Sequence, residues 1–386
     1  MKIGFFVGKF PYLRHILDYG GGEISAYNLA ISLAKRGHQL YVFTTSRDWK
    51  DSIENMDGML VRRYGTFLKF LRRNVSPSLT FKPLRHDVDV VHVHVGSSPI
   101  ELVAALSYAK IKSRPLVATY HGDIIPSQSG LAYQSSVMVY NFTVKKVLDY
   151  ADIIVSPSEH YVEESIFLKK YREKIEVIPN GINIENFELC YSKGEARKIL
   201  GLPINENIVL FLGVLHPKKG PHVLLRAMRY VSAKYPHVKL VMCGDGIMRE
   251  KLTELVKRLK ISDYVKFTGF VNEHLKLLYY KAADIFVLPS IMTTEVFPLV
   301  LLEASASGLP MIVSDLKTFK CIIEDGWNGL FTKRDDYKSL ADAIIYLLEN
   351  EDLRKTMGRN AKEKVKAYSW EKIAEEYEKV YRKLVQ

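Results

Sequence analysis

The chain has 386 residues, a formal net charge of +12 at neutral pH and 47% hydrophobic residues. This length and composition suffice for two domains of ordinary size, each with its own core. The three cysteines, Cys190, Cys243 and Cys321, are widely separated and form no Cys-x-x-Cys pair. Their spacing excludes a disulfide framework and predicts reduced core thiols in a cytoplasmic protein. No segment has the roughly eighteen apolar residues of a spanning helix, and residues 1–11 predict a first strand rather than a signal peptide.

The positive charge predicts an anionic partner, and its densest stretch runs from Arg62 to Arg85. This stretch contains no acidic residue, and aromatic and aliphatic residues alternate with its basic side chains: Arg62, Arg63, Lys69, Arg72, Arg73, Lys82 and Arg85. Such a pattern is typical of contact with an anionic bilayer or with nucleic acid. No nucleic-acid-binding motif is present, so the sequence favours peripheral contact with the cytoplasmic membrane face. A solvated surface segment is the alternative.

Short β-branched or apolar runs alternate with helical patterns through nearly the whole chain, which predicts stacked βαβ units. The predicted strands are 2–7, 39–44, 88–95, 116–119, 152–156, 175–178, 207–212, 238–243, 265–268, 284–288 and 311–313. Residues 151–158 and 283–290 agree at six of eight positions, which supports an internal repeat of architecture. The fold class is therefore α/β, with two doubly wound Rossmann-like domains.

Prolines and glycines interrupt the pattern between residues 178 and 207 and mark the domain boundary. We expect one domain over residues 1–190 and 368–386 and the other over residues 191–367. The final segment begins with Ser369 as an N-cap and carries one hydrophobic stripe, made of Trp370, Ile373, Tyr377, Val380 and Tyr381. It predicts a terminal helix that covers another surface.

Ligands of doubly wound sheets bind at the carboxyl ends of the strands, so the residues that follow each strand are the candidate site. In the first domain these are Gly20, Gly21, Gly22 and Glu23, ahead of a helix predicted over 24–36, and His121, which is followed by a glycine. The glycines form no Gly-x-Gly-x-x-Gly fingerprint, which disfavours a nicotinamide dehydrogenase. His92 and His94 lie within a strand and predict packed or half-exposed side chains. A flexible turn is the alternative for the glycines.

In the second domain, Lys218 and Lys219 precede Gly220 and suit an anionic group at a helix N-terminus, with an exposed basic turn as the alternative. Further strand-end residues are Gly213, Gly244, Gly269, Phe270 and Val271. We expect all these loops to rim one cleft.

Two carboxylates, Glu295 and Glu303, flank the start of a helix predicted over 298–307, with Pro298 at its first helical position. Helical spacing places Glu303 on a face of small residues, where it can meet a ligand. The unpaired N–H groups between the two acids are a natural seat for a phosphate. The alternative is an exposed loop acid and a paired core acid.

The order of these motifs, from Gly-Gly-Gly-Glu23 through His121-Gly, Pro-Asn180-Gly, Lys219-Gly220 and Glu295 to Glu303, resembles retaining glycosyltransferases of family 4. The resemblance extends from the first strand to Trp370. It implies the GT-B architecture, in which two Rossmann-like domains face a central cleft. In that architecture the N-terminal domain would bind the acceptor, the C-terminal domain would bind the nucleotide sugar, and the last helix would cross back to the N-terminal domain.

The resemblance implies that Glu303 holds the ribose hydroxyls and Glu295 those of the transferred sugar. Lys219, with Lys218 beside it, would neutralise the leaving diphosphate, and His121 would contact the sugar near the reacting carbon. It also implies that the backbone of Phe297, Pro298, Leu299 and Val300 contacts the diphosphate and the sugar. Gly213 and Gly244 would contact the donor, and Gly269, Phe270 and Val271 would border its base. Gly20, Gly21, Gly22 and Glu23 would lie on the acceptor side.

The implied reaction moves a hexosyl group from a UDP- or GDP-linked sugar to a lipid-linked or glycan acceptor, without a cofactor or metal. Asp87-Val-Asp89, the sole Asp-x-Asp, precedes its strand and so lies at the wrong sheet edge for a diphosphate-bound cation. Three positions depart from the family pattern: Val214 replaces an arginine, Val296 a glycine and Asn183 an aspartate. A sugar-nucleotide epimerase and a non-catalytic sugar-nucleotide-binding relative remain the alternatives.

Overall fold

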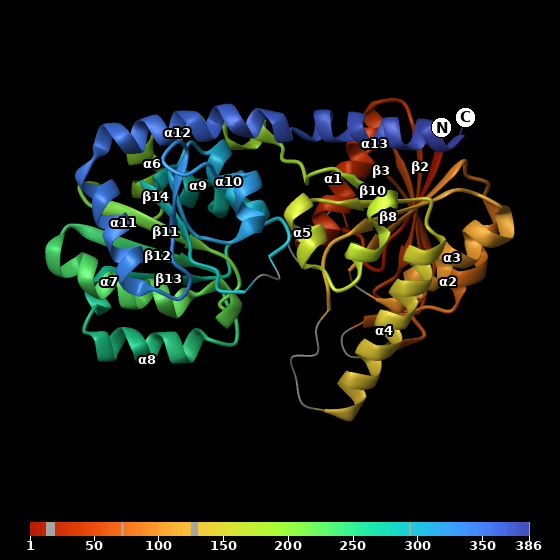
Figure 1. Cartoon of the computed structure of the whole chain (residues 1–386), viewed down its shortest axis with the longest axis horizontal. Coiled ribbons are helices and arrows are strands. Elements are labelled where there is room, and N and C mark those ends of the chain that lie inside the picture. The colour runs from red at the N-terminus through yellow and green to blue at the C-terminus, as the bar shows by residue number, and fades with distance from the viewer. Residues whose placement is uncertain (13–19, 71–72, 97, 125–129, 293–294, 386) are drawn as a thin grey trace. The chain divides into compact units, whose positions relative to one another are not determined.

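The computed structural model describes residues 1–12, 20–70, 73–96, 98–124, 130–292 and 295–385 (Figure 1). The chain divides into two compact units, each with its own sheet. Unit 1 consists of Met1–Gly181 and Trp370–Gln386, and unit 2 of Ile182–Ser369. The sequence placed these divisions after residues 190 and 367.

Unit 1 is built on an eight-stranded sheet in the order β10-β9-β8-β7-β1-β2-β4-β3, parallel except for the β3–β4 hairpin. Its strands are β1 (Lys2–Phe6), β2 (Gln39–Thr45), β3 (Ser52–Met56), β4 (Met59–Tyr64), β7 (Val90–Val95), β8 (Leu116–Tyr120), β9 (Ile153–Ser156) and β10 (Ile175–Val177), and a separate hairpin joins β5 (Leu68–Phe70) to β6 (Arg73–Val75). Sequence reasoning missed β3 and β4, although their turn residues, Asp57 and Gly58, both have positive φ, as a tight hairpin requires.

The helices of unit 1 are α1 (Gly21–Lys35), α2 (Ser78–Phe81), α3 (Pro99–Lys112), α4 (Leu131–Tyr150), α5 (Glu159–Glu164) and α13 (Trp370–Val385), with 3-10 turns at Lys82–Arg85 and Leu168–Lys174. The predicted stripe of α13 is buried in the same core as α1. Arg36, which ends α1, donates to Glu378 of α13 at 2.8 Å. The terminal helix therefore returns to the N-terminal unit, as predicted, because its apolar face completes that unit's core (Figure 1).

Unit 2 contains a six-stranded, fully parallel sheet in the order β13-β12-β11-β14-β15-β16. Its strands are β11 (Asn207–Leu212), β12 (Val238–Cys243), β13 (Val265–Gly269), β14 (Ile285–Leu288), β15 (Met311–Ser314) and β16 (Gly329–Thr332). Its helices are α6 (Lys193–Ile199), α7 (Pro221–Lys234), α8 (Arg249–Leu259), α9 (Glu273–Ala282), α10 (Leu299–Ala306), α11 (Tyr337–Glu349) and α12 (Glu351–Val365), with 3-10 turns at Ile184–Phe187, Pro217–Lys219, Ser262–Tyr264, Lys317–Cys321 and Lys366–Tyr368. The strand order reverses beside β11, and this is where doubly wound sheets bind ligands.

At three places in the two sheets, an aspartate that precedes one strand caps the amino end of the adjacent strand. The carboxylates of Asp89, Asp152 and Asp284 accept the N–H groups of Lys2, Leu116 and Ile208 at 2.7, 2.8 and 2.7 Å. In each pair the aspartate N–H donates back to the carbonyl of the same partner. This shared device accounts for the aspartate that residues 151–158 and 283–290 have in common. It also engages Asp89 at the amino edge of its sheet.

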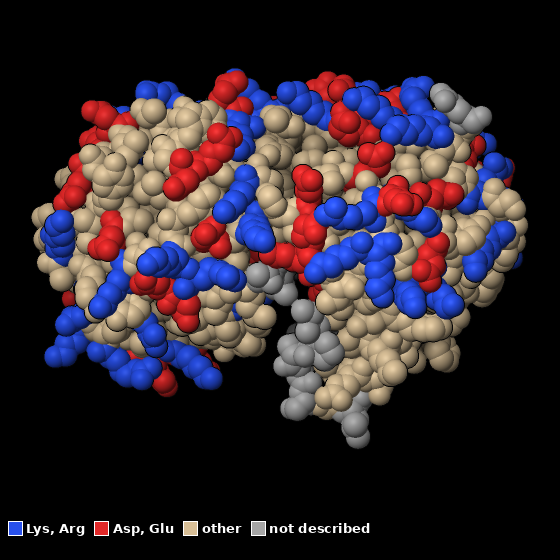
Figure 2. Space-filling view, in the orientation of Figure 1, with Lys and Arg blue, Asp and Glu red and all other residues tan. Residues whose placement is uncertain are grey.

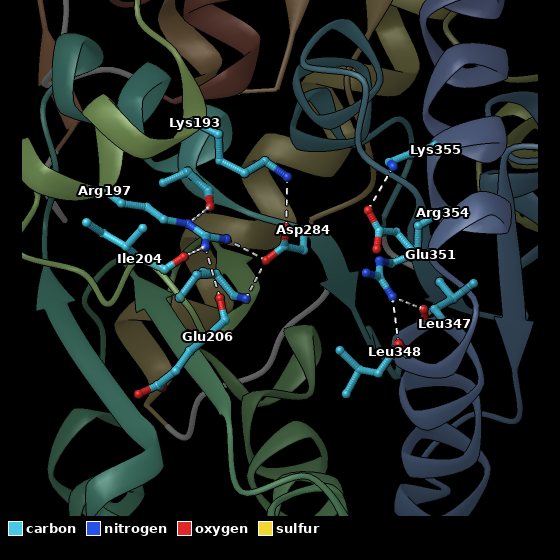
Figure 3. A network of polar contacts seen from close by, with 12 residues as sticks. Lys193, Arg197, Ile204, Glu206, Asp284, Leu347, Leu348, Glu351, Arg354 and Lys355 are labelled. Carbon is cyan, nitrogen blue, oxygen red and sulfur yellow. Dashed lines mark hydrogen bonds and ion pairs between the residues drawn. The ribbon is translucent and has the colours of Figure 1, made fainter.

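The cap at Asp284 belongs to a larger network at the amino edge of the unit 2 sheet (Figure 3). Arg197 of α6 is buried and donates to Asp284 at 2.6 Å and to the carbonyls of Ala282, Ile204 and Glu206. Lys193 lies 2.8 Å from the other carboxylate oxygen. Because the network satisfies loop carbonyls and strand ends, it fixes α6 to the sheet at the edge opposite to the candidate site.

Two predicted features differ in the structure. Cys190 is exposed and does not belong to the core, because it follows the 3-10 turn at Ile184–Phe187 on the surface, whereas Cys243 is buried. Arg63 is 0% exposed; it donates to the carbonyls of Phe10 and Pro11 and forms an ion pair with Glu54 at 3.2 Å. Arg63 is thus part of the core. It does not belong to the surface of the stretch from Arg62 to Arg85 that the sequence predicts to contact a membrane, which we call the predicted membrane surface.

Candidate functional site

Three strand-end loops interlock at the carboxyl edge of the unit 2 sheet. The N–H of Gly213, after β11, donates to Cys243 at 3.0 Å, and the N–H of Gly244, after β12, donates to Gly269 at 2.8 Å. A Cβ at Gly244 would lie 2.0 Å from the carbonyl oxygen of Gly213, so only glycine permits this approach. The structure therefore brings Gly213, Gly244 and Gly269, three residues predicted to contact the sugar donor, to the carboxyl edge of the sheet.

Lys219 and Glu295 form an ion pair, with 2.7 Å between the ammonium and Oε2. Gly220 makes the turn that places Lys219: its φ is +64°, and a Cβ there would meet the carbonyl of Pro289 at 1.9 Å. Glu295 is only 7% exposed, and its Oε1 is buried without a hydrogen-bond partner among the described residues. A buried carboxylate oxygen without a partner is costly, and a ligand hydroxyl would satisfy it.

Lys218 is held by its backbone while its side chain remains partly exposed. Its N–H donates to Nδ1 of His216 at 3.2 Å, and its carbonyl accepts from Ile291 at 2.8 Å. Burial and the neighbouring Lys218 lower the pKa of His216, which keeps that imidazole neutral. The 3-10 turn at Pro217–Lys219 carries two ammonium groups, those of Lys218 and Lys219.

Helix α10 begins at Leu299, because Pro298 has φ −75° and ψ +113° and acts as the N-cap rather than the first helical residue. The N–H of Leu301 already donates to the carbonyl of Pro298 at 3.0 Å. The N–H groups of Leu299 and Val300 belong to the first helical turn and have no acceptor within the helix. Phe297 is buried with its ring 5.9 Å from that of Tyr368. The N–H groups that remain for the predicted phosphate site are therefore those of Leu299 and Val300, in the first turn of α10.

Glu303, on the same helix, is fixed by two side chains of α9 that sequence reasoning missed. Lys276 lies 2.6 Å from Oε1, and the Tyr280 hydroxyl donates to Oε2 at 2.9 Å. Although burial lowers the pKa of Lys276, Glu303 and Glu273 outweigh it and hold that pKa above its ordinary value. A carboxylate accepts about four hydrogen bonds, so Glu303 retains acceptor capacity for a ligand. The sequence signal for these partners was their spacing, because residues 276 and 280 are one helical turn apart and lie on the same face of α9.

The flanks of this site are apolar and open to solvent. Val214, where the family pattern has an arginine, is 59% exposed, and Phe270 is 67% exposed. Val271 is partly buried and packs on the core of unit 2. An exposed ring at a strand end is suited to stack on a planar group such as a base.

In unit 1, His121 follows β8 and is anchored by its N–H, which donates to Val95 at 2.9 Å. A Cβ at Gly22 would lie 3.4 Å from the imidazole, and one at Gly96 would lie 3.1 Å from its Cβ. The two glycines therefore make room for the ring. Its Nε2 lies 2.8 Å from Nδ1 of His94. Burial lowers the pKa of His121 to about 4, so the imidazole is neutral at pH 7.

The other predicted acceptor-side residues lie at the start of α1. This helix begins at Gly21 rather than at Ile24, and Gly20 is its N-cap. Gly22 and Glu23 are therefore helical, because the glycines continue the helix instead of forming a loop. The Ser25 hydroxyl donates to Asn180 at 2.7 Å, which ties the Pro-Asn-Gly turn to the same helix.

Comparison with known proteins assigns both halves of the chain. Residues 19–186 match the model of Glycosyltransferase Family 4, and residues 192–364 match Glycosyl transferases group 1. The chain is 30% identical over 375 residues to an uncharacterized glycosyltransferase of Methanocaldococcus jannaschii, covering 94% of each protein. It is 28% identical over 411 residues to the alpha-monoglucosyldiacylglycerol synthase of Acholeplasma laidlawii, covering 100% of this chain and 98% of the relative.

The fold is similar to that of Anabaena HepE, solved in complex with UDP-glucose, with a TM-score of 0.77, 20% identity and full coverage of both chains. The two Rossmann-like sheets of this chain and its terminal helix, which returns to unit 1, are features of the GT-B architecture. From the matched models and the full-length relative it follows that this chain belongs to the retaining glycosyltransferases of family 4, enzymes that transfer a sugar from a nucleotide sugar.

Proposed function

We propose that the protein is a metal-independent hexosyltransferase that uses a UDP- or GDP-linked sugar and a lipid-linked or glycan acceptor. Unit 2 binds the donor, and the observation that carries this is the ion pair of Lys219 and Glu295 beside the first turn of α10. It joins a cation suited to a diphosphate with a carboxylate whose second oxygen is buried without a described partner.

In this proposal Lys219 and Lys218 oppose the charge that develops on the diphosphate as the glycosidic bond breaks. Fixed charges aimed at a developing anion stabilise a transition state more than a ground state, and this lowers the barrier. The first-turn N–H groups of α10 contribute the same sign of field. The leaving group is therefore stabilised by the protein itself.

Glu295 and Glu303 bind hydroxyl groups at the two ends of the donor, the first on the sugar and the second on the ribose. Lys276 and Tyr280 each hold one oxygen of Glu303 and so fix the orientation in which the carboxylate accepts from two adjacent hydroxyls. Phe270 and Val271 border the base. On the side of unit 1, His121 contacts the sugar, and Gly20 to Glu23 lie on the acceptor side.

The acceptor class rests on the relatives and on the surface of unit 1. The synthase of Acholeplasma laidlawii is named for a glucosylated diacylglycerol. In unit 1, the predicted membrane surface keeps exposed side chains at Phe67, Leu68, Lys69, Phe81 and Arg85, and Phe67 is 83% exposed. No helix among the described residues is long and apolar enough to cross a membrane. We infer that this surface rests on an anionic bilayer that holds the acceptor.

Liposome flotation tests the membrane contact at low salt. Phe67→Ser combined with Lys69→Glu should reduce binding to anionic vesicles, while neutral vesicles bind weakly in every case. The matched control is Phe142→Ser with Lys145→Glu on α4, whose surface also exposes apolar side chains and shows few charges in Figure 2. Equal binding of wild type to anionic and neutral vesicles contradicts the contact, and loss in the α4 variant alone would assign it to α4.

A thermal-shift scan of nucleotide sugars followed by product analysis tests the function. The proposal predicts stabilisation by one nucleotide sugar, release of the nucleoside diphosphate, and a product whose anomeric configuration matches the donor. An isomerised nucleotide sugar formed without acceptor would instead indicate an epimerase. Binding without transfer to any lipid or glycan acceptor would indicate a non-catalytic relative.

A further inference from the structure

Three histidine rings of unit 1 stack on one another: His92 and His94 are buried, and His121, at the candidate site, is partly exposed. His92 and His94 lie two residues apart on β7 and so share one face of the sheet, with their ring centroids 4.5 Å apart. The ring of His94 is 5.1 Å from that of His121, with 12° between the planes. We call these three residues the histidine stack. Its hydrogen bonds determine which nitrogen of each ring carries the proton.

The terminal helix fixes the first ring. The Tyr381 hydroxyl lies 2.7 Å from Nδ1 of His92, and burial raises the pKa of Tyr381 well above its ordinary value. The phenol is therefore protonated, and among the described residues Nδ1 of His92 is the hydrogen-bond partner of this hydroxyl. The O–H is satisfied only by donating there, so Nδ1 is the acceptor. His92 then carries its proton on Nε2 and donates to the Thr119 hydroxyl at 2.7 Å, which also lies 3.0 Å from the hydroxyl of Tyr377.

His94 has one hydrogen-bonded nitrogen. Its Nδ1 lies 2.8 Å from Nε2 of His121, whereas its own Nε2 is buried with no partner among the described residues. A buried N–H without an acceptor is rarer and more costly than an unused lone pair. The proton of His94 therefore belongs on Nδ1, from which it donates to His121.

The acceptor nitrogen of His121 is then Nε2, which leaves its proton on Nδ1. We propose that His94 is a positioning residue that holds His121 in the Nδ1–H tautomer, so that His121 presents a neutral N–H donor to a substrate hydroxyl. The contact with substrate rests on the proposed function, but the tautomer does not. From β7 the ring of His94 faces His121, and His92 stacks on His94 behind it. Burial keeps all three imidazoles neutral by lowering their pKa values.

Imidazole NMR reads the tautomer directly. In the full-length protein labelled with ¹⁵N-histidine, long-range ¹H–¹⁵N spectra distinguish a protonated nitrogen from a bare one. We expect His94 and His121 protonated at Nδ1 and His92 at Nε2, with no change between pH 6 and 8. Assignment uses the single variants described next. A proton on Nε2 of His121 in the wild type would overturn the proposal.

Two substitutions separate positioning from packing. His94→Phe keeps a stacked ring without a donor, whereas His94→Asn places an amide near the position of Nδ1 and can still donate. His94→Phe should release His121 from the Nδ1–H tautomer and lower kcat at least ~10-fold, because a histidine in the wrong tautomer loses much of its activity. His94→Asn should retain both properties, and circular dichroism should confirm that both variants fold.

The outcomes distinguish this inference from the proposed function. An unchanged His121 spectrum in folded His94→Phe would overturn the positioning role, as would a changed spectrum with full turnover. If the wild type shows no transfer with any nucleotide sugar, the proposed function fails. The spectra of the wild type and of His94→Phe then still decide whether His94 sets the tautomer.

Discussion

The ammonium of Lys219 lies 2.7 Å from the carboxylate of Glu295, and both side chains are largely buried. The two residues are 76 positions apart in the chain. Each is the counter-ion of the other, and in the proposed function the pair binds a ligand that carries a diphosphate and hydroxyl groups. The ion pair fixes the positions of both charged groups, and fixed charges are the ones that stabilise a transition state effectively if the proposed function holds.

Lys219→Ala should lower kcat by ~10²-fold or more, because it removes a charge that acts on the leaving diphosphate. Steady-state turnover at saturating donor measures this effect. Lys219→Arg, which keeps the charge, is the matched control and should recover part of the loss. Full turnover of Lys219→Ala would remove this residue from the proposed role.

Val214→Arg should increase kcat/KM for the donor by ~3- to 10-fold, equivalent to about 1 kcal/mol of added stabilisation. Val214 is 59% exposed next to Gly213, so an arginine fits without displacing core atoms. Val214→Gln provides a control of similar length without charge. A rise shared by both variants would show that charge is not the cause.

Lys276→Met should raise the dissociation constant for the nucleoside diphosphate by ~10-fold, because Glu303 loses its cation and its fixed orientation. Glu303→Ala should weaken nucleotide binding by at least as much. Titration calorimetry measures both, with the exposed Lys257→Met on α8 as the control. Unchanged nucleotide affinity in Glu303→Ala would refute the ribose assignment.

Asp284→Asn should reduce the free energy of unfolding by about 2–4 kcal/mol, since it leaves the buried guanidinium of Arg197 without its counter-ion. Chemical denaturation monitored by circular dichroism tests the expectation. Donor affinity of the folded variant should remain unchanged, because this network lies at the amino edge of the sheet (Figure 3). A selective loss of donor binding with normal stability would contradict a structural role.

Glu378 predicts an acid-sensitive contribution to the stability of unit 1. Hydrogen bonds from Arg382 and Arg36 lower its pKa to about 2, and His38 lies 3.6 Å away. A depressed pKa stabilises the fold above the ordinary carboxyl range and loses this effect as the pH falls toward the folded value. Wild type should therefore exceed Glu378→Gln by about 1 kcal/mol at pH 6, with the gap closing between about pH 4.5 and 2.

Unfolding free energies measured across that pH range test this prediction. Glu376→Gln is a suitable control, because Glu376 pairs with Lys379 on the exposed side of α13. A constant gap down to pH 2 would show that ionisation of Glu378 is not responsible.

The sequence by itself determined the strands of the two doubly wound sheets other than β3, β4 and β16, and a terminal helix with one apolar face. These follow from local signals: apolar runs of strand length, glycines at strand ends, and the stripe from Trp370 to Tyr381. The order of motifs also determined the family. Each of these properties depends on neighbours in the chain or on a periodicity that burial imposes.

Only the tertiary structure decided which groups pair. It placed Lys276 on Glu303, buried Arg63 within a basic stretch whose Lys69 and Arg85 are exposed, and stacked His94 on His121. Such contacts join residues distant in the chain, and their geometry depends on how parallel strands and their helices pack. Burial lowers the pKa of His94 and of His121, and this desolvation acts only once the chain has folded.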